Sequence, residues 1–194
     1  MTRVAGLVLA GGAARRMGGG DKPLRLLHGR PLLDYVLDAM DMPSRAISAN
    51  GDPARFASYG LPVLADGAFA DRGPLAGVLA GMDWAAHQGA DTLLTVPGDT
   101  PFLPPGLAVR LTPAPACARC EGQTHYLTAL WRVRDRNALR AFLSAGGSPR
   151  VSRFAAHIGM GYVDIPLDDA MWFMNVNTLR DLSSMETMTS RNRS

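Results

Sequence analysis

The sequence predicts an α/β protein in three layers, with a mostly parallel central sheet between two layers of helices. The first apolar run, residues 4–10, ends in glycines and does not alternate with polar residues, which is typical of a buried parallel strand. Stretches with strand and helix character then alternate as far as residue 99. A length of 194 residues with 47% hydrophobic content is enough for one domain with a sizeable core.

The elements of the first half can be placed in order. A helix is expected to begin near Pro31, because proline suits the first helical turn and Leu32, Leu33, Val36, Leu37 and Met40 share one face. The following elements are a strand at 44–50, a short helix at 53–59, a strand at 62–65, a helix at 74–87 and a strand that ends at Asp99. Ligands of such sheets bind at the carboxyl ends of the strands.

Beyond residue 99 the alternation loosens. The pattern predicts a strand at 124–133, helices at 135–145 and 150–156, and short strands at 162–165 and 173–175. Thr178 is expected to cap a last helix. We expect one domain over residues 1–185 and a disordered tail over 186–194.

Composition excludes several classes of function. The first 30 residues carry six of the arginines and lysines against one acid, Asp21, whereas only 7% of the chain is aromatic. This local charge fits a compact phosphate ligand better than a nucleic acid. No apolar run approaches ~18 residues and the N-terminus lacks a cleavage site, so we expect a cytoplasmic protein without membrane contact. Cys117 and Cys120 form a lone C-x-x-C without a second ligand pair, which favours two reduced thiols.

A loop rich in glycine and arginine follows the first strand, in the stretch LVLAGGAARRMGGGDKPL at residues 7–24. It has neither the P-loop order nor a G-x-G-x-x-G that opens a helix. Its glycines let backbone N–H groups approach anionic oxygens, and Arg15, Arg16 and Lys22 can neutralise them. The stretch therefore predicts a phosphate-binding loop, with a flexible solvated loop as the alternative.

Two aspartates end predicted strands. Asp99, in VPGDTPF, could hold Mg²⁺ against substrate phosphates, and Asp66, in VLADG, could accept hydrogen bonds from a base or ribose. Each could instead be a turn residue. The helix start RGPLAG offers free N–H groups to an anion or a base edge. No Ser-His-Asp or Cys-His order identifies a nucleophile.

The L-A-G-G, R-M-G-G and D-K elements of the loop, at this spacing, resemble the signature of the molybdenum cofactor guanylyltransferases. GPLAG, PGDTPF, HYLTAL, PRVSRF and FMNVNT recur in the same order as in that family, as far as about Leu182. The resemblance implies a Rossmann-like nucleotidyltransferase that uses Mg²⁺ to join GMP from GTP to molybdopterin and releases pyrophosphate.

The resemblance also implies roles for individual residues. Lys22 would contact the phosphates, and Asp99 would bind GTP and the metal. Residue chemistry adds Arg16 to these two as catalytic residues, because its charge can stabilise the departing pyrophosphate. The nucleotide contacts expected are Leu9, Ala10, Gly11, Gly12, Lys22, Ser48, Asp66 and Asp99. Where the family pattern reads N-A-N, this chain has Ser48-Ala49-Asn50, so it departs from the family at Ser48.

The predicted nucleotide contacts leave four polar residues of the C-terminal half without a role: Arg150, Arg153, Asn175 and Asn177. They are of the types that a pterin ring edge and its phosphate need, so this half is the predicted pterin site. The alternative is that the asparagines only satisfy strand-end backbone and that the arginines are solvated. One alternative is a CTP-dependent cytidylyltransferase acting on molybdopterin or on a sugar or polyol phosphate, against which Gly12 argues. The other is a non-catalytic cofactor carrier, against which Lys22 and Asp99 argue. Molybdoenzymes or their chaperones are candidate partners.

Overall fold

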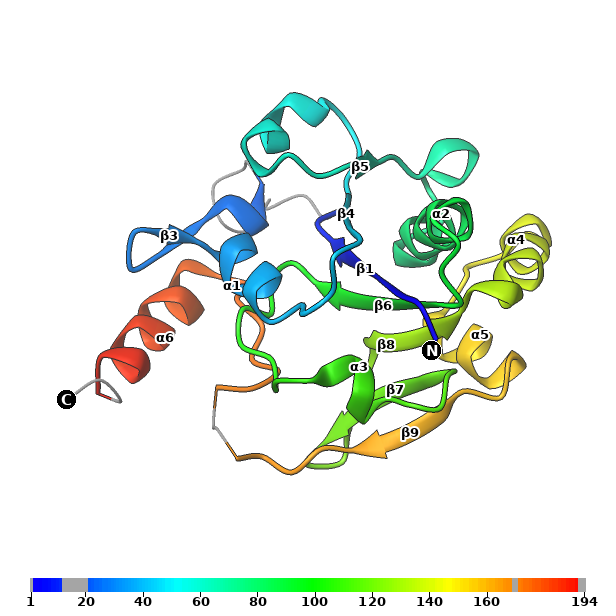
Figure 1. Cartoon of the computed structure of the whole chain (residues 1–194). Helices are drawn as coiled ribbons and strands as arrows, with labels where there is room; N and C mark the ends of the chain where they lie inside the picture. Colours follow the sequence, from blue (N-terminus) through cyan, green and yellow to red (C-terminus); the bar gives the residue numbers. More distant parts are fainter. Residues whose placement is uncertain (1, 12–20, 169–170, 192–194) are drawn as a thin grey trace.

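The computed structural model describes residues 2–11, 21–168 and 171–191. In these ranges seven strands form one sheet in the order β5-β4-β1-β6-β8-β7-β9 (Figure 1). They are β1 (Val4–Leu9), β4 (Arg45–Ser48), β5 (Val63–Leu64), β6 (Thr92–Pro97), β7 (Ala116–Cys120), β8 (Gln123–Arg132) and β9 (Gly161–Asp164). Only β8 runs antiparallel to its neighbours, β6 and β7, and the other pairs are parallel. The predicted mostly parallel α/β sheet is confirmed.

Helices cover both faces of this sheet (Figure 1). One face packs against α2 (Pro74–His87), α4 (Arg136–Ser144) and α5 (Val151–His157). The other packs against α1 (Leu32–Asp38), α3 (Leu107–Arg110) and the 3-10 helix η3 (Pro53–Tyr59). The remaining elements are η2 (Lys22–Leu24), β2 (Leu26–Leu27), β3 (Arg30–Pro31), η4 (Gly67–Phe69), η5 (Val133–Asp135) and α6 (Leu179–Arg191).

The burial of β1 explains its unbroken apolar sequence. Leu7 belongs to the core beneath α2, and Val8 to the core beneath α1, and both are fully buried. Successive side chains of a strand point to opposite faces, so a strand covered on both faces needs apolar residues at every position.

The sequence pattern predicted one strand that the structure lacks and missed strand β7, helix α3 and the β2–β3 hairpin. Residues 173–175 were expected to form a strand, but Phe173 has φ 64°, and that conformation is incompatible with a strand. Strand β7 was not predicted, although it lies between β8 and β9. It contains Cys117 and Cys120, which are both free cysteines and are buried. Desolvation raises the pKa of the Cys117 thiol to about 11, so this thiol stays protonated.

The C-terminal helix begins as expected and ends later. The Thr178 hydroxyl accepts a hydrogen bond from the Asp181 N–H at 3.1 Å, and the Asp181 carboxylate accepts one from the Thr178 N–H at 2.8 Å. This reciprocal pair is a capping box. The helix continues through residues 186–191, where we expected a disordered tail. Met185 is fully buried against the β2–β3 hairpin, and Thr189 Oγ1 lies 2.5 Å from a ring nitrogen of His28, which secures the last turns.

No helix in the described ranges combines the length and apolar character needed to span a membrane.

Candidate functional site

The carboxyl ends of β1, β4, β5 and β6 meet at one edge of the sheet, and two adjoining cavities open there. They measure about 290 and about 280 Å³. Leu9, Gly11 and Pro74 line both. The first is further lined by Ala10, Lys22, Pro23, Pro97, Asp99, Leu127 and Asn175, and the second by Ser48, Asn50, Asp66, Ala70, Gly73 and Gly77. The described nucleotide contacts predicted from the sequence therefore share one continuous site.

The ammonium group of Lys22 makes two short hydrogen bonds beside the first cavity. Lys22 Nζ donates to Asp99 Oδ2 and to Asn177 Oδ1, each at 2.5 Å. The side chains of Lys22 and Asp99 are only 16% and 24% exposed, so their ion pair is partly shielded from water. Gly98 keeps this corner tight, because a Cβ there would lie 2.9 Å from Pro23 Cγ. The lack of a side chain at Gly98 thus lets the Pro23 ring, which follows Lys22, pack against the end of β6.

The segment of residues 175–177 lies against the end of β6. The Val176 N–H donates to the Asp99 carbonyl at 2.8 Å, and the Thr100 hydroxyl donates to Asn175 Oδ1 at 2.6 Å. Asn175 and Asn177 therefore adjoin the residues expected to bind nucleotide. Asn175 and Asn177 belong to the predicted pterin half of the sequence, yet in the folded chain they contact Thr100 and Lys22 of the predicted nucleotide half.

A paired carboxylate and amide form one wall of the second cavity. Asn50 Nδ2 donates to Asp66 Oδ2 at 2.7 Å, and the Asp66 N–H donates to Asn50 Oδ1 at 2.9 Å. Desolvation raises the pKa of Asp66, and the hydrogen bond from Asn50 partly offsets this effect. Asn50 was not singled out from the sequence, although it lies in the Ser48-Ala49-Asn50 segment that departs from the family pattern.

Helix α2 starts at the junction of the two cavities. Gly73 precedes it with φ 68° and ψ −163°, a conformation that is essentially restricted to glycine, and Pro74 occupies the first helical position. At Gly77 the helix passes so close to β4 that an added Cβ would contact Ser48 Oγ. The predicted helix start RGPLAG thus brings the N-terminus of α2 to the site, where Pro74 has no N–H and the Ala76 N–H donates to the Gly73 carbonyl at 3.0 Å.

Comparison with known proteins identifies the family. The model of the MobA-like NTP transferase domain matches residues 6–158. A molybdenum cofactor guanylyltransferase of Acidiphilium cryptum is 53% identical over 93% of this chain and 92% of its own length. This chain belongs to the molybdenum cofactor guanylyltransferase family. A second member, from Cereibacter sphaeroides, is 48% identical over 96% of this chain and 97% of its own length.

Solved structures agree on the fold of the family. Molybdopterin-guanine dinucleotide biosynthesis protein A of Archaeoglobus fulgidus superimposes with a TM-score of 0.72, at 19% identity, over 96% of this chain and 99% of that one. A nucleotidyl transferase of Methanothermobacter has a TM-score of 0.75 at 16% identity, over 99% of this chain and 100% of that one. At these identities the likeness concerns the fold alone.

The remaining predicted site residues line neither cavity or fall outside the described ranges. Arg150 immediately precedes α5 and Arg153 lies on it, and both are exposed and line neither cavity. Gly12, Arg15 and Arg16 fall among residues 12–20, outside the described residues.

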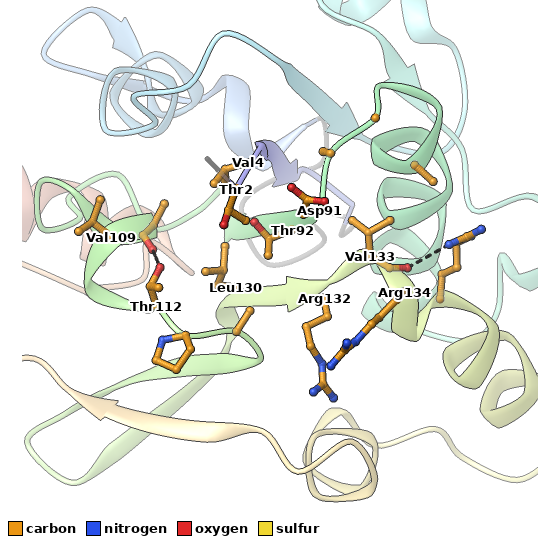
Figure 2. Close-up of a pocket in the computed structure, with 17 residues that line it drawn as sticks. Thr2, Val4, Asp91, Thr92, Val109, Thr112, Leu130, Arg132, Val133 and Arg134 are labelled. Carbon is orange, nitrogen blue, oxygen red and sulfur yellow. Dashed lines mark hydrogen bonds between the residues drawn. The ribbon is translucent and has the colours of Figure 1, made fainter.

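A larger hollow, of about 830 Å³, lies at the opposite edge of the sheet, where β1 and β6 begin (Figure 2). Thr2, Val4 and Thr92 line it together with Arg132 and Arg134 (Figure 2). None of the described residues expected to bind nucleotide or pterin is among its lining residues. Size alone would point to this hollow, but the family residues converge at the carboxyl edge, which is where ligands of open α/β sheets bind.

Proposed function

We propose that this chain transfers GMP from GTP to the terminal phosphate of molybdopterin and releases pyrophosphate. The observation that carries the proposal is the meeting of Lys22, Asp99 and Asn177 through contacts of 2.5 Å. Lys22 and Asp99 place a cation and a carboxylate at the wall of the first cavity, and Asn177 of the C-terminal segment holds the Lys22 ammonium from behind that wall. The guanylyltransferase names of the relatives support the choice of substrates.

The two cavities suggest how GTP would lie. The guanosine would occupy the cavity of Ser48 and Asp66, where the Asp66 carboxylate can accept hydrogen bonds from N–H groups of guanine or hydroxyls of ribose. The phosphates would reach Lys22 and Asp99 in the adjoining cavity. The N-terminus of α2 faces both and favours negative charge between them.

The chemistry needs no protein nucleophile. A terminal phosphate oxygen of molybdopterin would attack the α-phosphorus of GTP in line, and the bond from the α-phosphorus to the bridging oxygen of pyrophosphate would break. That oxygen leaves with the electron pair. Lys22 would stabilise the charge that develops on the leaving group, and Arg16 is proposed for the same task. The enzyme thus acts by positioning and by charge neutralisation.

We also propose that the reaction depends on Mg²⁺ at Asp99. No group of three or more His, Cys, Asp or Glu side chains capable of holding a metal is found among the described residues. A single carboxylate still fits, because Mg²⁺ is commonly held by one or two carboxylates, by water and by substrate phosphates. Bound Mg²⁺ would neutralise phosphate charge. Asp99 would hold the ion, and Lys22, whose ammonium pairs with Asp99, would lie beside the same phosphates.

The pterin is proposed to bind beside Asn175 and Asn177, with Arg150 and Arg153 available to its phosphate. Arginine forks match phosphate geometry, and asparagine can both donate to and accept from a pterin edge. A cytoplasmic location and contact with molybdoenzymes or their chaperones stay predictions.

The deciding experiment measures pyrophosphate release with molybdopterin and each of GTP, CTP and ATP, in Mg²⁺ and after chelation. We expect release with GTP and Mg²⁺, and loss of it on chelation. Faster release with CTP would instead identify a cytidylyltransferase. Saturable GTP binding without release from any nucleotide would identify a carrier, and full activity in chelator would refute the metal proposal.

A further inference from the structure

Arg55, on the short helix η3, contacts two segments of the site at once. Its Nη1 forms an ion pair with Asp21 Oδ1 at 3.0 Å, and its Nη2 donates to the Asn50 carbonyl at 2.7 Å. The side chains of Arg55 and Asp21 are 32% and 19% exposed, so the pair is partly shielded from water. The guanidinium carbon lies 5.2 Å from the ring centroid of the fully buried Phe56, which anchors it further.

These two partners belong to opposite ends of the proposed nucleotide site. Asp21 directly precedes Lys22, which binds Asp99 on the phosphate side. Asn50 holds Asp66 on the base side through the two hydrogen bonds described above. Arg55 therefore closes a chain of polar contacts that crosses the carboxyl edge of the sheet.

We propose that Arg55 is a positioning residue that couples the base side of the site to its phosphate side. The inference rests on the proposed binding of GTP at this edge. A planar guanidinium presents separate nitrogens in a rigid fork, so Nη1 and Nη2 can hold two acceptors at a fixed spacing, whereas lysine offers one rotatable ammonium for both. With Arg55 in place, a displacement of Asn50 and Asp66 is transmitted to the backbone that carries Lys22.

Charge gives Arg55 a second effect on the same site. Arg55 forms an ion pair with Asp21. Removal of Arg55 takes this positive partner from the Asp21 carboxylate, which lies one residue from Lys22 and close to the expected GTP phosphates. Like charges repel, so removal of the arginine should weaken phosphate binding beyond the loss of the contact itself.

Four variants of the full-length chain separate these effects: Arg55→Ala, Arg55→Lys, Arg55→Ala with Asp21→Asn, and Arg140→Ala as a control. Arg140 on α4 pairs with Asp83 on α2 at 2.7 Å, and neither residue lines either cavity. Each variant is measured for GTP affinity by titration, for kcat and KM in transfer to molybdopterin, and for melting temperature.

We expect Arg55→Ala to weaken GTP binding about tenfold and to lower kcat, because a charge-assisted contact and the alignment of Lys22 are lost together. Arg55→Lys should recover part of the GTP affinity but not the kcat. Adding Asp21→Asn to Arg55→Ala should also recover part of the affinity, and Arg140→Ala should match wild type.

The proposal is overturned if Arg55→Ala lowers only the melting temperature, or if Asp21→Asn adds its own independent loss. It is also overturned if Arg55→Lys behaves as wild type in kcat, because the fork would then be dispensable. Failure of the proposed function has a different signature: wild type itself would bind GTP and release no pyrophosphate, while the binding differences among the variants would remain measurable.

Discussion

Gly77 offers a sharp test of how closely α2 is fitted to the candidate site. A methyl group there would contact Ser48 Oγ and would lie 3.3 Å from Leu9 Cδ2 and 3.4 Å from Asp66 Oδ1. Ser48 is buried, so its hydroxyl has little room to move. Gly77→Ala therefore pushes directly on side chains that line the second cavity.

The magnitude follows from two opposed effects. Alanine stabilises a helix interior by about 1 kcal/mol relative to glycine. Overpacking of a closed interior costs about 1–3 kcal/mol. We expect the second effect to prevail by about 1 kcal/mol, which corresponds to a fall in melting temperature of about 2–4 °C for a chain of this size. Displacement of Ser48 and Asp66 should also weaken GTP binding about tenfold, or about 1.4 kcal/mol.

A second glycine on the same helix provides the matched control. A methyl group on Gly81 would contact the buried Leu7 and would lie 3.0 Å from Leu93 Cδ2, in the core beneath α2. Gly81→Ala should lower the melting temperature in the same way but leave GTP affinity unchanged. Ser48→Ala combined with Gly77→Ala should recover melting temperature, because the contacted oxygen is gone. A more stable Gly77→Ala variant with wild-type GTP affinity would refute the reasoning.

The remaining predictions concern charged residues and the separate binding of GTP and molybdopterin. Asp99→Asn should lower kcat at least about 100-fold, which is the usual effect of removing a group that stabilises developing charge. A near-normal kcat in steady-state assays would contradict the metal assignment. Burial raises the pKa of Asp66, so the folded chain keeps this proton to a higher pH than the unfolded chain, and the free energy of unfolding falls as pH rises through that interval. Asp66→Asn should remove this slope in melting curves across the acidic range and weaken GTP binding about tenfold, and an unchanged slope would contradict the pKa assignment. Asn177→Ala should weaken binding of GTP as well as molybdopterin, because Asn177 holds Lys22, whereas Arg150→Ala should impair transfer to molybdopterin alone by about tenfold. Equal GTP affinities in titrations of these two variants would refute the distinction.

The sequence by itself determined the elements whose causes are local. An apolar run ending in glycine predicted β1, and a proline followed by regularly spaced apolar residues predicted α2 at residues 74–87. The Thr178 cap was likewise predicted, because capping involves residues only three apart. The positions of Asp66 and Asp99 after strands placed both at one edge, since parallel strands end together.

Tertiary structure decided what depends on contacts between distant segments. Strand β7 exists because β8 and β9 pair with it, and the last turns of α6 persist because Met185 is buried against the β2–β3 hairpin. The contact of Asn177 with Lys22 spans 155 positions. The bridge from Arg55 to Asp21 joins a 3-10 helix to a loop end. Periodicity and spacing in the sequence indicate only the local environment of a side chain. Contacts between distant residues depend on how loops from separate strands pack at the sheet edge, so they are seen only in the folded chain.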